Sequence, residues 1–135
     1  MFTFKRKSTR PAPRRSKSDL CISAVLAGNP KSRCWQISFR VSTDTMKKLR
    51  LLPNDKVVAT CDPVNNRHTL TRVHNDEGNQ ISTRQSKTSY YGQVRFSCSR
   101  DELEALGLLN GDDNSTRIEA DLIETDGASG VFAAK

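Results

Sequence analysis

The sequence predicts a mainly β fold with short helices, in which one strand–helix–strand–strand unit occurs twice. The first observation is an internal repeat, because residues 37–55 align without a gap on residues 94–112. The second is the alternation of apolar and polar residues at the start of each copy, which is the period of a half-buried strand. The third is a serine followed by a short helical pattern after each strand. Identical residues of the two copies include Phe39 and Phe96, Ser42 and Ser99, Asp44 and Asp101, Leu49 and Leu106, and Asp55 and Asp112.

Each copy begins with the alternating strand. In the first copy Ile37, Phe39 and Val41 fall on one face, because successive side chains of a strand point to opposite faces. An apolar stretch at residues 21–26 predicts a further strand, which we expect to pair as a hairpin with residues 35–42. The apolar residues of the second alternating strand are Val94, Phe96 and Cys98.

The helices are predicted to start at serine N-caps. Ser42 and Ser99 each stand just before the helical pattern, where a serine hydroxyl accepts a hydrogen bond from an unpaired backbone N–H. Ser99 and Glu102 have the spacing of a capping box. Acidic residues fall in both first turns, where the helix dipole favours negative charge. The residues predicted to mark the buried side of the helices are Met46, Leu49, Leu103 and Leu106.

Each helix is followed by a turn and a predicted hairpin. Pro53 and Asn110-Gly111 are the turn signals. In the first copy, strands at residues 56–61 and 68–73 flank an Asn-rich turn. In the second copy, strands at 117–123 and 131–132 flank Asp126-Gly127, after about three additional residues near position 115.

Composition divides the chain into four parts with unequal charge. Residues 1–19 are a basic tail that we expect to be disordered, since it carries seven basic side chains and few apolar ones. Residues 20–73 hold the first copy with its preceding strand, and residues 93–135 hold the second copy. Residues 74–92 are predicted to be a polar loop or linker with at most one weak strand. The formal net charge of +7 favours a polyanionic partner, although residues 94–135 carry nine acidic and four basic side chains.

The order strand, short helix, turn, strand, turn, strand resembles the swapped-hairpin proteins of the AbrB, SpoVT and MraZ type. The residues that carry the resemblance are 94–108, which end in Ala-Leu-Gly-Leu, followed by Gly111-Asp112. The chain departs from that family at Ser42 and Ser99, which replace a proline, and at Met46 and Leu103, which replace an arginine. The resemblance implies a small swapped-hairpin β-barrel, either as a monomeric pseudo-dimer of the two copies or as a homodimer. It also implies a DNA-binding regulator.

Basic residues of the tail and of the first copy are therefore the expected nucleic-acid contacts. A flexible cationic arm can follow phosphates without reading sequence. The resemblance places further contacts around the first strand and its helix; for the helix cations, a solvated helix face is an equally good interpretation. The expected contacts are Lys5, Arg6, Lys7, Arg10, Arg14, Arg15, Lys17, Lys31, Arg33, Arg40, Lys47, Lys48 and Arg50.

Three aromatic residues are candidates for stacking on bases or for partner contact. Tyr90 and Tyr91 precede the second repeat strand in a polar stretch and are expected to be exposed. Trp35 begins the first repeat strand, and we expect it to close one end of the core.

The sequence argues against several other classes. It has no Gly-rich phosphate loop, no nucleophile elbow and no standard zinc spacing, so we expect a protein that is not an enzyme and needs no cofactor or metal. Cys61, His68 and His74 match no metal pattern, and the four cysteines are expected to be buried free thiols. No run of 18 apolar residues and no secretory signal is present, which predicts no membrane association and a cytoplasmic location.

Three functions stay open from the sequence. DNA binding comes first, in a regulator of the kind found in a phage or mobile element. The alternative is an interaction or inhibitor module, in which the acidic second copy binds a protein or mimics nucleic acid. RNA binding is the third, because phosphate contacts do not distinguish RNA from DNA.

Overall fold

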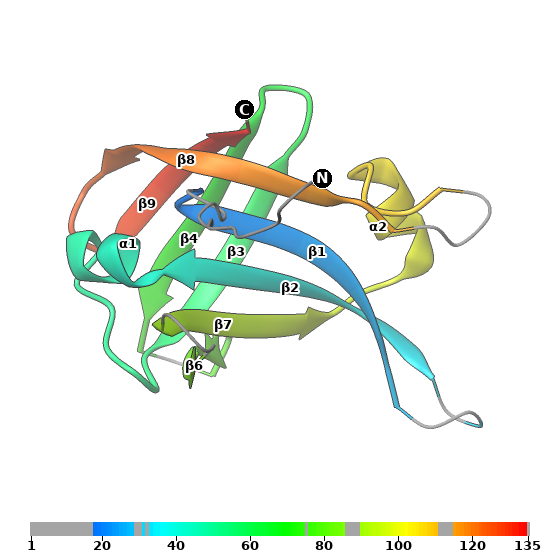
Figure 1. Ribbon diagram of the computed structural model, residues 1–135, viewed down its shortest axis with the longest axis horizontal. Coiled ribbons are helices and arrows are strands. Elements are labelled where there is room, and N and C mark those ends of the chain that lie inside the picture. The colour runs from blue at the N-terminus through cyan, green and yellow to red at the C-terminus, as the bar shows by residue number, and fades with distance from the viewer. Residues whose placement is uncertain are drawn as a thin grey trace, which may run out of the picture.

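A computed structural model describes residues 18–28, 31, 33–74, 76–85, 90–110 and 115–134. These residues form nine strands and two helices (Figure 1). The strands are β1 (Leu20–Ala27), β2 (Cys34–Ser42), β3 (Lys56–Asp62), β4 (Arg67–Val73), β5 (Asn79–Gln80), β6 (Ser82–Gln85), β7 (Tyr90–Ser97), β8 (Arg117–Thr125) and β9 (Ser129–Ala134). The helices are α1 (Thr43–Lys48) and α2 (Arg100–Ala105). The predicted mainly β fold with short helices is confirmed.

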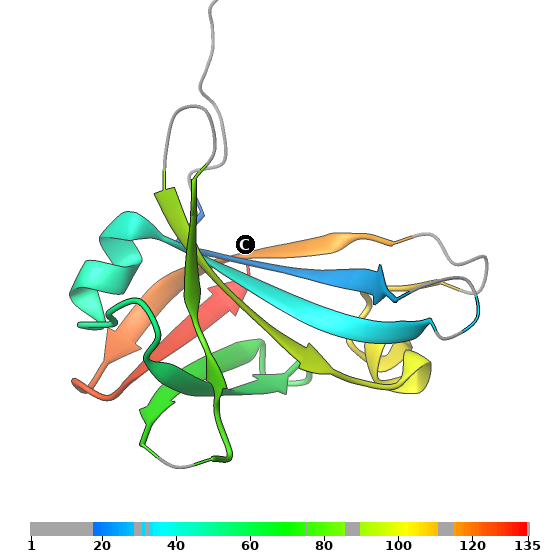
Figure 2. The ribbon, with the colours of Figure 1, turned by 90° about the horizontal axis from the view of Figure 1, so that it is seen from below.

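One antiparallel sheet contains all nine strands in the order β5-β3-β4-β9-β8-β1-β2-β7-β6. Its two outermost strands, β5 and β6, are separated in sequence only by Ile81. The segment from β5 to β6 therefore lies along both edges of the sheet, which makes the sheet barrel-like and nearly closed (Figure 2). Ile81 strengthens the junction, since it accepts a hydrogen bond from the Asn54 amide and donates one to the Asp55 carbonyl, each 2.8 Å long.

The core fills the inside of this sheet. Leu20, Ile22, Phe39, Val41 and Val94 are almost completely buried, and they occupy alternate positions of three neighbouring strands, as the strand period requires. Phe39 and Phe96 meet edge to face, with ring centroids 5.9 Å apart. The predicted inward faces of β2 and β7 are thus correct, and Trp35 packs against this core as a partly buried residue.

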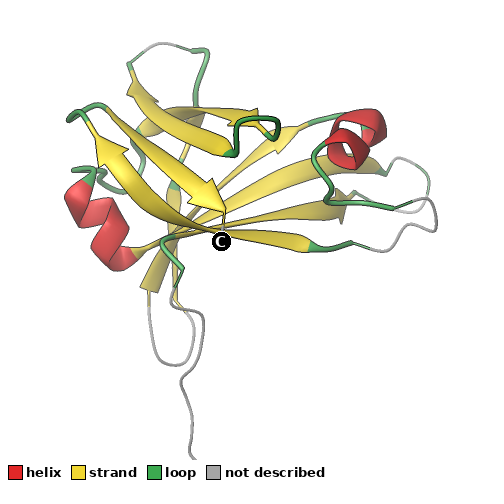
Figure 3. Ribbon diagram, turned by 90° about the horizontal axis from the view of Figure 1, so that it is seen from above, coloured by secondary structure: helices red, strands yellow, loops and turns green. Residues whose placement is uncertain are grey.

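The helices lie at opposite ends of the barrel (Figure 3). Both start as predicted, because the Ser42 hydroxyl accepts from the Thr45 amide and the Ser99 hydroxyl accepts from the Glu102 amide. The capping box of Ser99 and Glu102 is also present. Neither helix in the part of the chain described here has the length and apolar character that crossing a membrane requires.

The structure corrects the predicted linker at residues 74–92. That segment contains β5, β6 and the first residues of β7. Its one strongly apolar residue, Ile81, is completely buried. The segment is polar because Asn79 and Gln80 of β5 and Ser82 and Thr83 of β6 are exposed, so hydrophobic periodicity gives little signal there.

The predicted hairpins are confirmed. β1 pairs with β2 over its whole length, β3 pairs with β4, and β8 pairs with β9. Asp62 and Asp126 open the two later turns, where each carboxylate accepts a backbone N–H from the third residue after it. The Asn65 side-chain amide, which also donates to Asp62, and the Asn65 backbone amide lower the pKa of Asp62, and the hydrogen bonds from Ser129 lower the pKa of Asp126.

Candidate nucleic-acid interface

Strand register builds a basic surface on the outside of the sheet. Arg117 pairs with Ser23, Ser23 pairs with Ser38, and Ser38 pairs with Arg95, so the four residues form one row across β8, β1, β2 and β7. Paired residues of antiparallel strands share a face. This is the face opposite the core, because Phe39 and Val94, the adjacent residues, point inward. Arg95 and Arg117 therefore lie at the two ends of an outward row, and both are exposed.

Arg40 occupies the next row of the same face. It pairs with Gln93 and is exposed. Its guanidinium lies 4.6 Å from the centroid of the Tyr91 ring, which is within the range of a cation–π interaction. Arg40, Tyr91, Gln93, Arg95 and Arg117 are called the basic strand face below.

Buried polar groups hold the middle of the basic strand face in place. Ser38 and Gln93 are nearly inaccessible although they point outward. The Gln93 side-chain amide donates to the Ser38 hydroxyl at 3.0 Å, which supplies the partner that a buried amide requires. This cross-strand bond fixes the backbone from which Arg40 and Arg95 project.

Arg117 shares this face with two acidic residues of its own strand, Glu119, which lies in the row of Arg40, and Asp121. Its Nε lies 3.9 Å from a carboxylate oxygen of Glu119, and the Arg117 side chain is 65% exposed. An exposed pair at that distance contributes little. Glu119 also accepts a hydrogen bond of 2.7 Å from the Ser18 hydroxyl.

The structure does not bring all the predicted contacts together. Lys31 and Arg33 lie in the connection from β1 to β2, whereas Lys47, Lys48 and Arg50 lie at the far end of α1, which follows the other end of β2 (Figure 1). A nine-residue strand spans roughly 30 Å. Arg40, on β2 itself, lies between the two groups. The seven predicted tail contacts, from Lys5 to Lys17, lie outside the described residues.

The two tyrosines differ from the prediction. Tyr91 belongs to β7 and is half-buried beneath Arg40, so it is not the freely exposed ring expected from its polar surroundings. The Arg40 guanidinium lies over the face of this ring. Tyr90 starts β7, and its side chain lies outside what the structure describes.

Arg95, Arg117 and Gln93 are the members of the basic strand face that the sequence prediction missed. Their outward direction is contained in the alternation of β7 and β8. Their grouping is not, because it depends on β1 and β2 lying between β8 and β7 in the sheet. Pairing of strands far apart in sequence leaves no periodic signal in either strand.

Cys61, His68 and His74 do not come together as a metal site. Cys61 and His68 are cross-strand partners, but His74 follows the other end of β4, about 20 Å further along the strand. Among the residues that the structure describes, no three His, Cys, Asp or Glu side chains are grouped so as to hold a metal. All four cysteines are free.

The thiols are less uniform than expected. Cys34 is exposed, which corrects the expectation that all four are buried, and the other three are half-buried. Burial raises the pKa of the Cys61 thiol to about 11, and it also raises the pKa of Cys21 and Cys98. These three residues are therefore thiols rather than nucleophilic thiolates at neutral pH.

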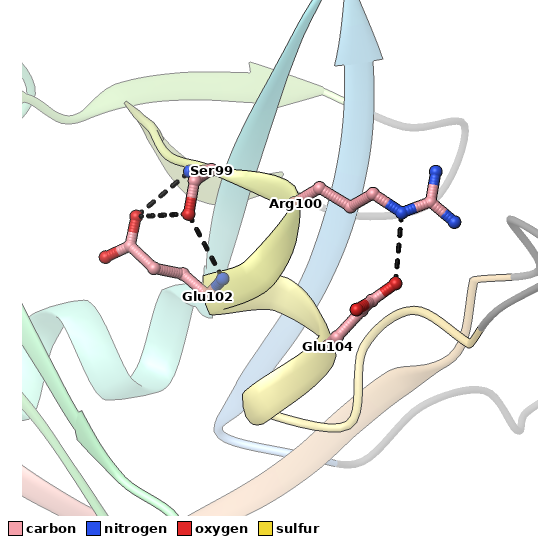
Figure 4. A network of polar contacts seen from close by, with 4 residues as sticks. All are labelled: Ser99, Arg100, Glu102 and Glu104. Carbon is pink, nitrogen blue, oxygen red and sulfur yellow. Dashed lines mark hydrogen bonds and ion pairs between the residues drawn. The ribbon is translucent and has the colours of Figure 1, made fainter.

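The end of the barrel at α2 is acidic. α2 carries Asp101 and Glu102 in its first turn and no basic residue in its last turn, whereas α1 ends with Lys47 and Lys48. On α2, Arg100 is bonded to Glu104 at 3.0 Å (Figure 4). The surface is thus basic at α1 and along the strand face, and acidic at α2.

Fold and surface together define a small, mainly β, barrel-like protein with a basic outer sheet face. Comparison of the chain with protein-family models, with curated proteins and with solved structures gives no match.

Proposed function

We propose that this chain binds duplex DNA through the basic strand face, assisted by the end of α1 and by the basic tail. The observation that carries the proposal is the row in which Arg117 and Arg95 are three strands apart, with Arg40 in the adjacent row. Strands are about 4.8 Å apart, so the two backbones are roughly 14 Å apart. This is close to the width of the major groove, about 12 Å, so the two long side chains can reach phosphates on both of its sides.

The pairing pattern supports a duplicated swapped-hairpin barrel of the AbrB type. Ser38 and Arg95, which pair at the centre of β2 and β7, are also the two residues that the repeat alignment places over one another, 57 positions apart. The same shift of 57 positions converts the pair Val25 and Gln36 of one hairpin into the pair Ser82 and Gln93 of the other. A two-fold relation between copies would produce this register, as in a pseudo-dimer.

Charge distribution determines the expected orientation on DNA. The lysines of α1 and the arginines of the strand face would meet phosphates, while the acidic α2 would point away from them. Phosphate contacts of this kind give affinity and position, and sequence preference requires base contacts in addition. Arg40 is the best placed to make one, because its stacking on Tyr91 orders the guanidinium.

The test compares full-length Arg95→Gln with Arg100→Gln by fluorescence anisotropy on labelled duplex DNA at several salt concentrations. Both changes remove one cation from the second half of the chain, but Arg100 is on acidic α2 and bonded to Glu104. For Arg95→Gln we expect weaker binding and a salt slope smaller in magnitude by about 0.9, the value for one phosphate contact. Arg100→Gln should leave both quantities unchanged.

Two results would contradict the proposal. Equal binding by Arg95→Gln, Arg40→Gln and the unchanged chain would show that the folded domain does not contact DNA. Stronger binding to double-stranded or single-stranded RNA of the same length would show that the surface binds RNA rather than DNA.

A further inference from the structure

An apolar pocket of about 440 Å³ opens at the α2 end of the barrel. Its walls come from the inner face of the sheet and from one side of α2. Phe39, Phe96, Cys61, Leu103 and Leu106 are among its apolar lining residues. A pocket of this size and lining fits one or two large apolar side chains.

The pocket lies where the barrel is incompletely paired. One edge of β3 pairs with β4, and its other edge pairs with β5 only at Lys56 and Val57. One edge of β7 pairs with β2, and its other edge pairs with β6 only as far as Gln93. The rest of both edges, residues 58–62 and 94–97, has no ladder partner there among the described residues. One such carbonyl, that of Arg95, accepts from the side chain of Asn79 at 2.6 Å. Unpaired strand edges can bind an extended segment through main-chain hydrogen bonds.

The rim of the pocket is acidic and partly apolar. Glu102 lines it, Asp101 is next to Glu102 on α2, and Asp62 immediately precedes the lining residue Pro63. The hydrogen bonds of its turn lower the pKa of Asp62, so its charge persists to low pH. Val64, in the same turn, is 89% exposed. An occupant should therefore combine large apolar side chains with neighbouring positive charge.

At the other end of the barrel, α1 packs directly on the sheet. Leu49, the C-cap residue of α1, approaches the backbone of Gly130 so closely that a Cβ atom at Gly130 would be 2.5 Å from the Cδ2 of Leu49. Met46 approaches Gly92 in the same way. Leu106, the counterpart of Leu49 in the repeat alignment, is only half-buried. α2 thus leaves apolar surface that its own side chains do not cover.

We propose that residues 2–7 of this same chain, Phe-Thr-Phe-Lys-Arg-Lys, occupy the α2 pocket. Phe2 and Phe4 alternate with Thr3 and Lys5, so an extended segment directs both rings to one face. Lys5, Arg6 and Lys7 follow at once and complement the acidic rim. The segment therefore has the apolar side chains, the extended pattern and the charge that the pocket and the open strand edges require.

The chain is long enough for this contact to form within one molecule. The described part begins at Ser18, before β1, and the pocket lies near the other end of β1, which spans roughly 27 Å. The chain from Phe4 to Ser18 can extend to about 45 Å. Residues 2–7 would dock whether or not the chain binds DNA, and the tail cations left to assist DNA binding would then be Arg10, Arg14, Arg15 and Lys17.

Site-specific photocrosslinking in the full chain tests the assignment. Phe4 is replaced by p-benzoylphenylalanine, the protein is irradiated, and crosslinked peptides are mapped by mass spectrometry. We expect crosslinks to residues 59–63 of β3 and its turn, or to residues 96–106. Crosslinks elsewhere, or none to these residues, would overturn the proposal.

Two variants with opposite charges at one position provide the control. Ala105 lines the pocket but is exposed, so Ala105→Arg and Ala105→Glu should both fold, which circular dichroism checks. Ala105→Arg should reduce the crosslink yield several-fold and Ala105→Glu should keep it, because only the arginine repels Lys5, Arg6 and Lys7. Equal yields in both variants would count against the electrostatic part of the assignment.

A second readout is independent of the crosslinker. Phe2→Ser with Phe4→Ser should increase the rate of iodoacetamide modification at Cys98, which lines the pocket, and leave the rate at exposed Cys34 unchanged. An unchanged Cys98 rate would contradict occupancy. Crosslinking of mixed isotope-labelled and unlabelled chains then identifies the source, and predominantly mixed crosslinks would replace the intramolecular contact by a second copy of the chain.

Discussion

Arg50 and Gly107 adopt the same unusual backbone conformation. Their φ angles are +58° and +79°, and each follows the C-cap residue of its helix, Leu49 or Leu106. Glycine adopts positive φ without steric cost, whereas a residue with a Cβ atom is strained there. The second copy thus has the residue that its backbone favours, and the first copy has a cation in its place.

Exchanging glycine at these two positions should change stability in opposite directions. Arg50→Gly should increase the free energy of unfolding by up to about 1 kcal/mol, and Gly107→Ala should decrease it by about the same amount. An added Cβ at Gly107 would contact nothing within 4 Å, so only the backbone is tested. Urea unfolding measures both, with Arg50→Gln as the control that removes the charge but keeps the strain. A destabilised Arg50→Gly would show that the arginine side chain outweighs the backbone effect.

His68 should make the stability of the fold depend on pH. Its side chain is buried and its Nδ1 has no hydrogen-bond partner among the described residues. Burial lowers the pKa of His68 below its ordinary value of 6.5, and the nearby Asp62 opposes this only partly. The unfolded chain therefore binds a proton before the folded chain does, so the stabilisation is complete above pH 6.5 and is lost as the pH falls below it.

Urea unfolding between pH 7.5 and pH 5 measures this dependence. The unchanged chain should lose stability towards pH 5, while His68→Leu should be nearly flat over the same range. The carboxyl groups of Asp62 and Asp126, whose pKa values are below 3.8, do not titrate in this window. His74→Gln serves as the control that should keep the dependence. A flat profile for the unchanged chain would argue that His68 is protonated in the folded state.

At the scale of elements, the two helices use the same terminal hydrogen bonds with different side chains. At the end of α1, the amides of Arg50 and Leu51 donate to the carbonyls of Lys47 and Met46. At the end of α2, the amides of Gly107 and Leu108 donate to the carbonyls of Glu104 and Leu103. This is the Schellman arrangement at both ends. Backbone geometry is thus the same in both elements although their surface charge is opposite.

The N-cap of α2 should contribute more than its ion pair. Ser99→Ala removes the hydroxyl that accepts from the Glu102 amide (Figure 4) and should cost about 1 kcal/mol of unfolding free energy. Arg100→Ala removes the exposed pair with Glu104 and should cost only about 0.3 kcal/mol. Thermal or urea unfolding compares them, and a larger effect for Arg100→Ala would mean that its other contacts matter more than the cap.

At the scale of the whole molecule, the barrel is sealed at the α1 end by helix packing. Gly130→Ala should destabilise the protein by about 1–3 kcal/mol, because the new Cβ would clash with Leu49 and Leu122. The double variant with Leu49→Ala should lose less stability than the sum of the two separate losses, because the smaller side chain at position 49 makes room for the new Cβ. Unfolding free energies of the two single variants and the double variant measure the coupling. Additive losses would show that Leu49 and position 130 are not in contact.

Much of the local structure follows from the sequence. The strands of each copy, the serine caps, the capping box and the hairpin turns were predictable because each depends on residues within one turn or one strand period. The buried faces of β2 and β7 were predictable for the same reason. Segment 79–85 was not, because Ile81 is its only apolar residue and the remaining pattern is polar.

The sequence by itself determined the mainly β character and the two capped helices. It also determined that the first helix carries basic residues and the second acidic ones. The tertiary structure alone decided that Arg40, Arg95 and Arg117 share one surface, that residues 79–85 bring the sheet close to closure, and that α2 leaves a pocket. The physical reason is range. Periodicity and capping act between neighbouring residues, whereas these three features depend on pairing between strands far apart in the chain.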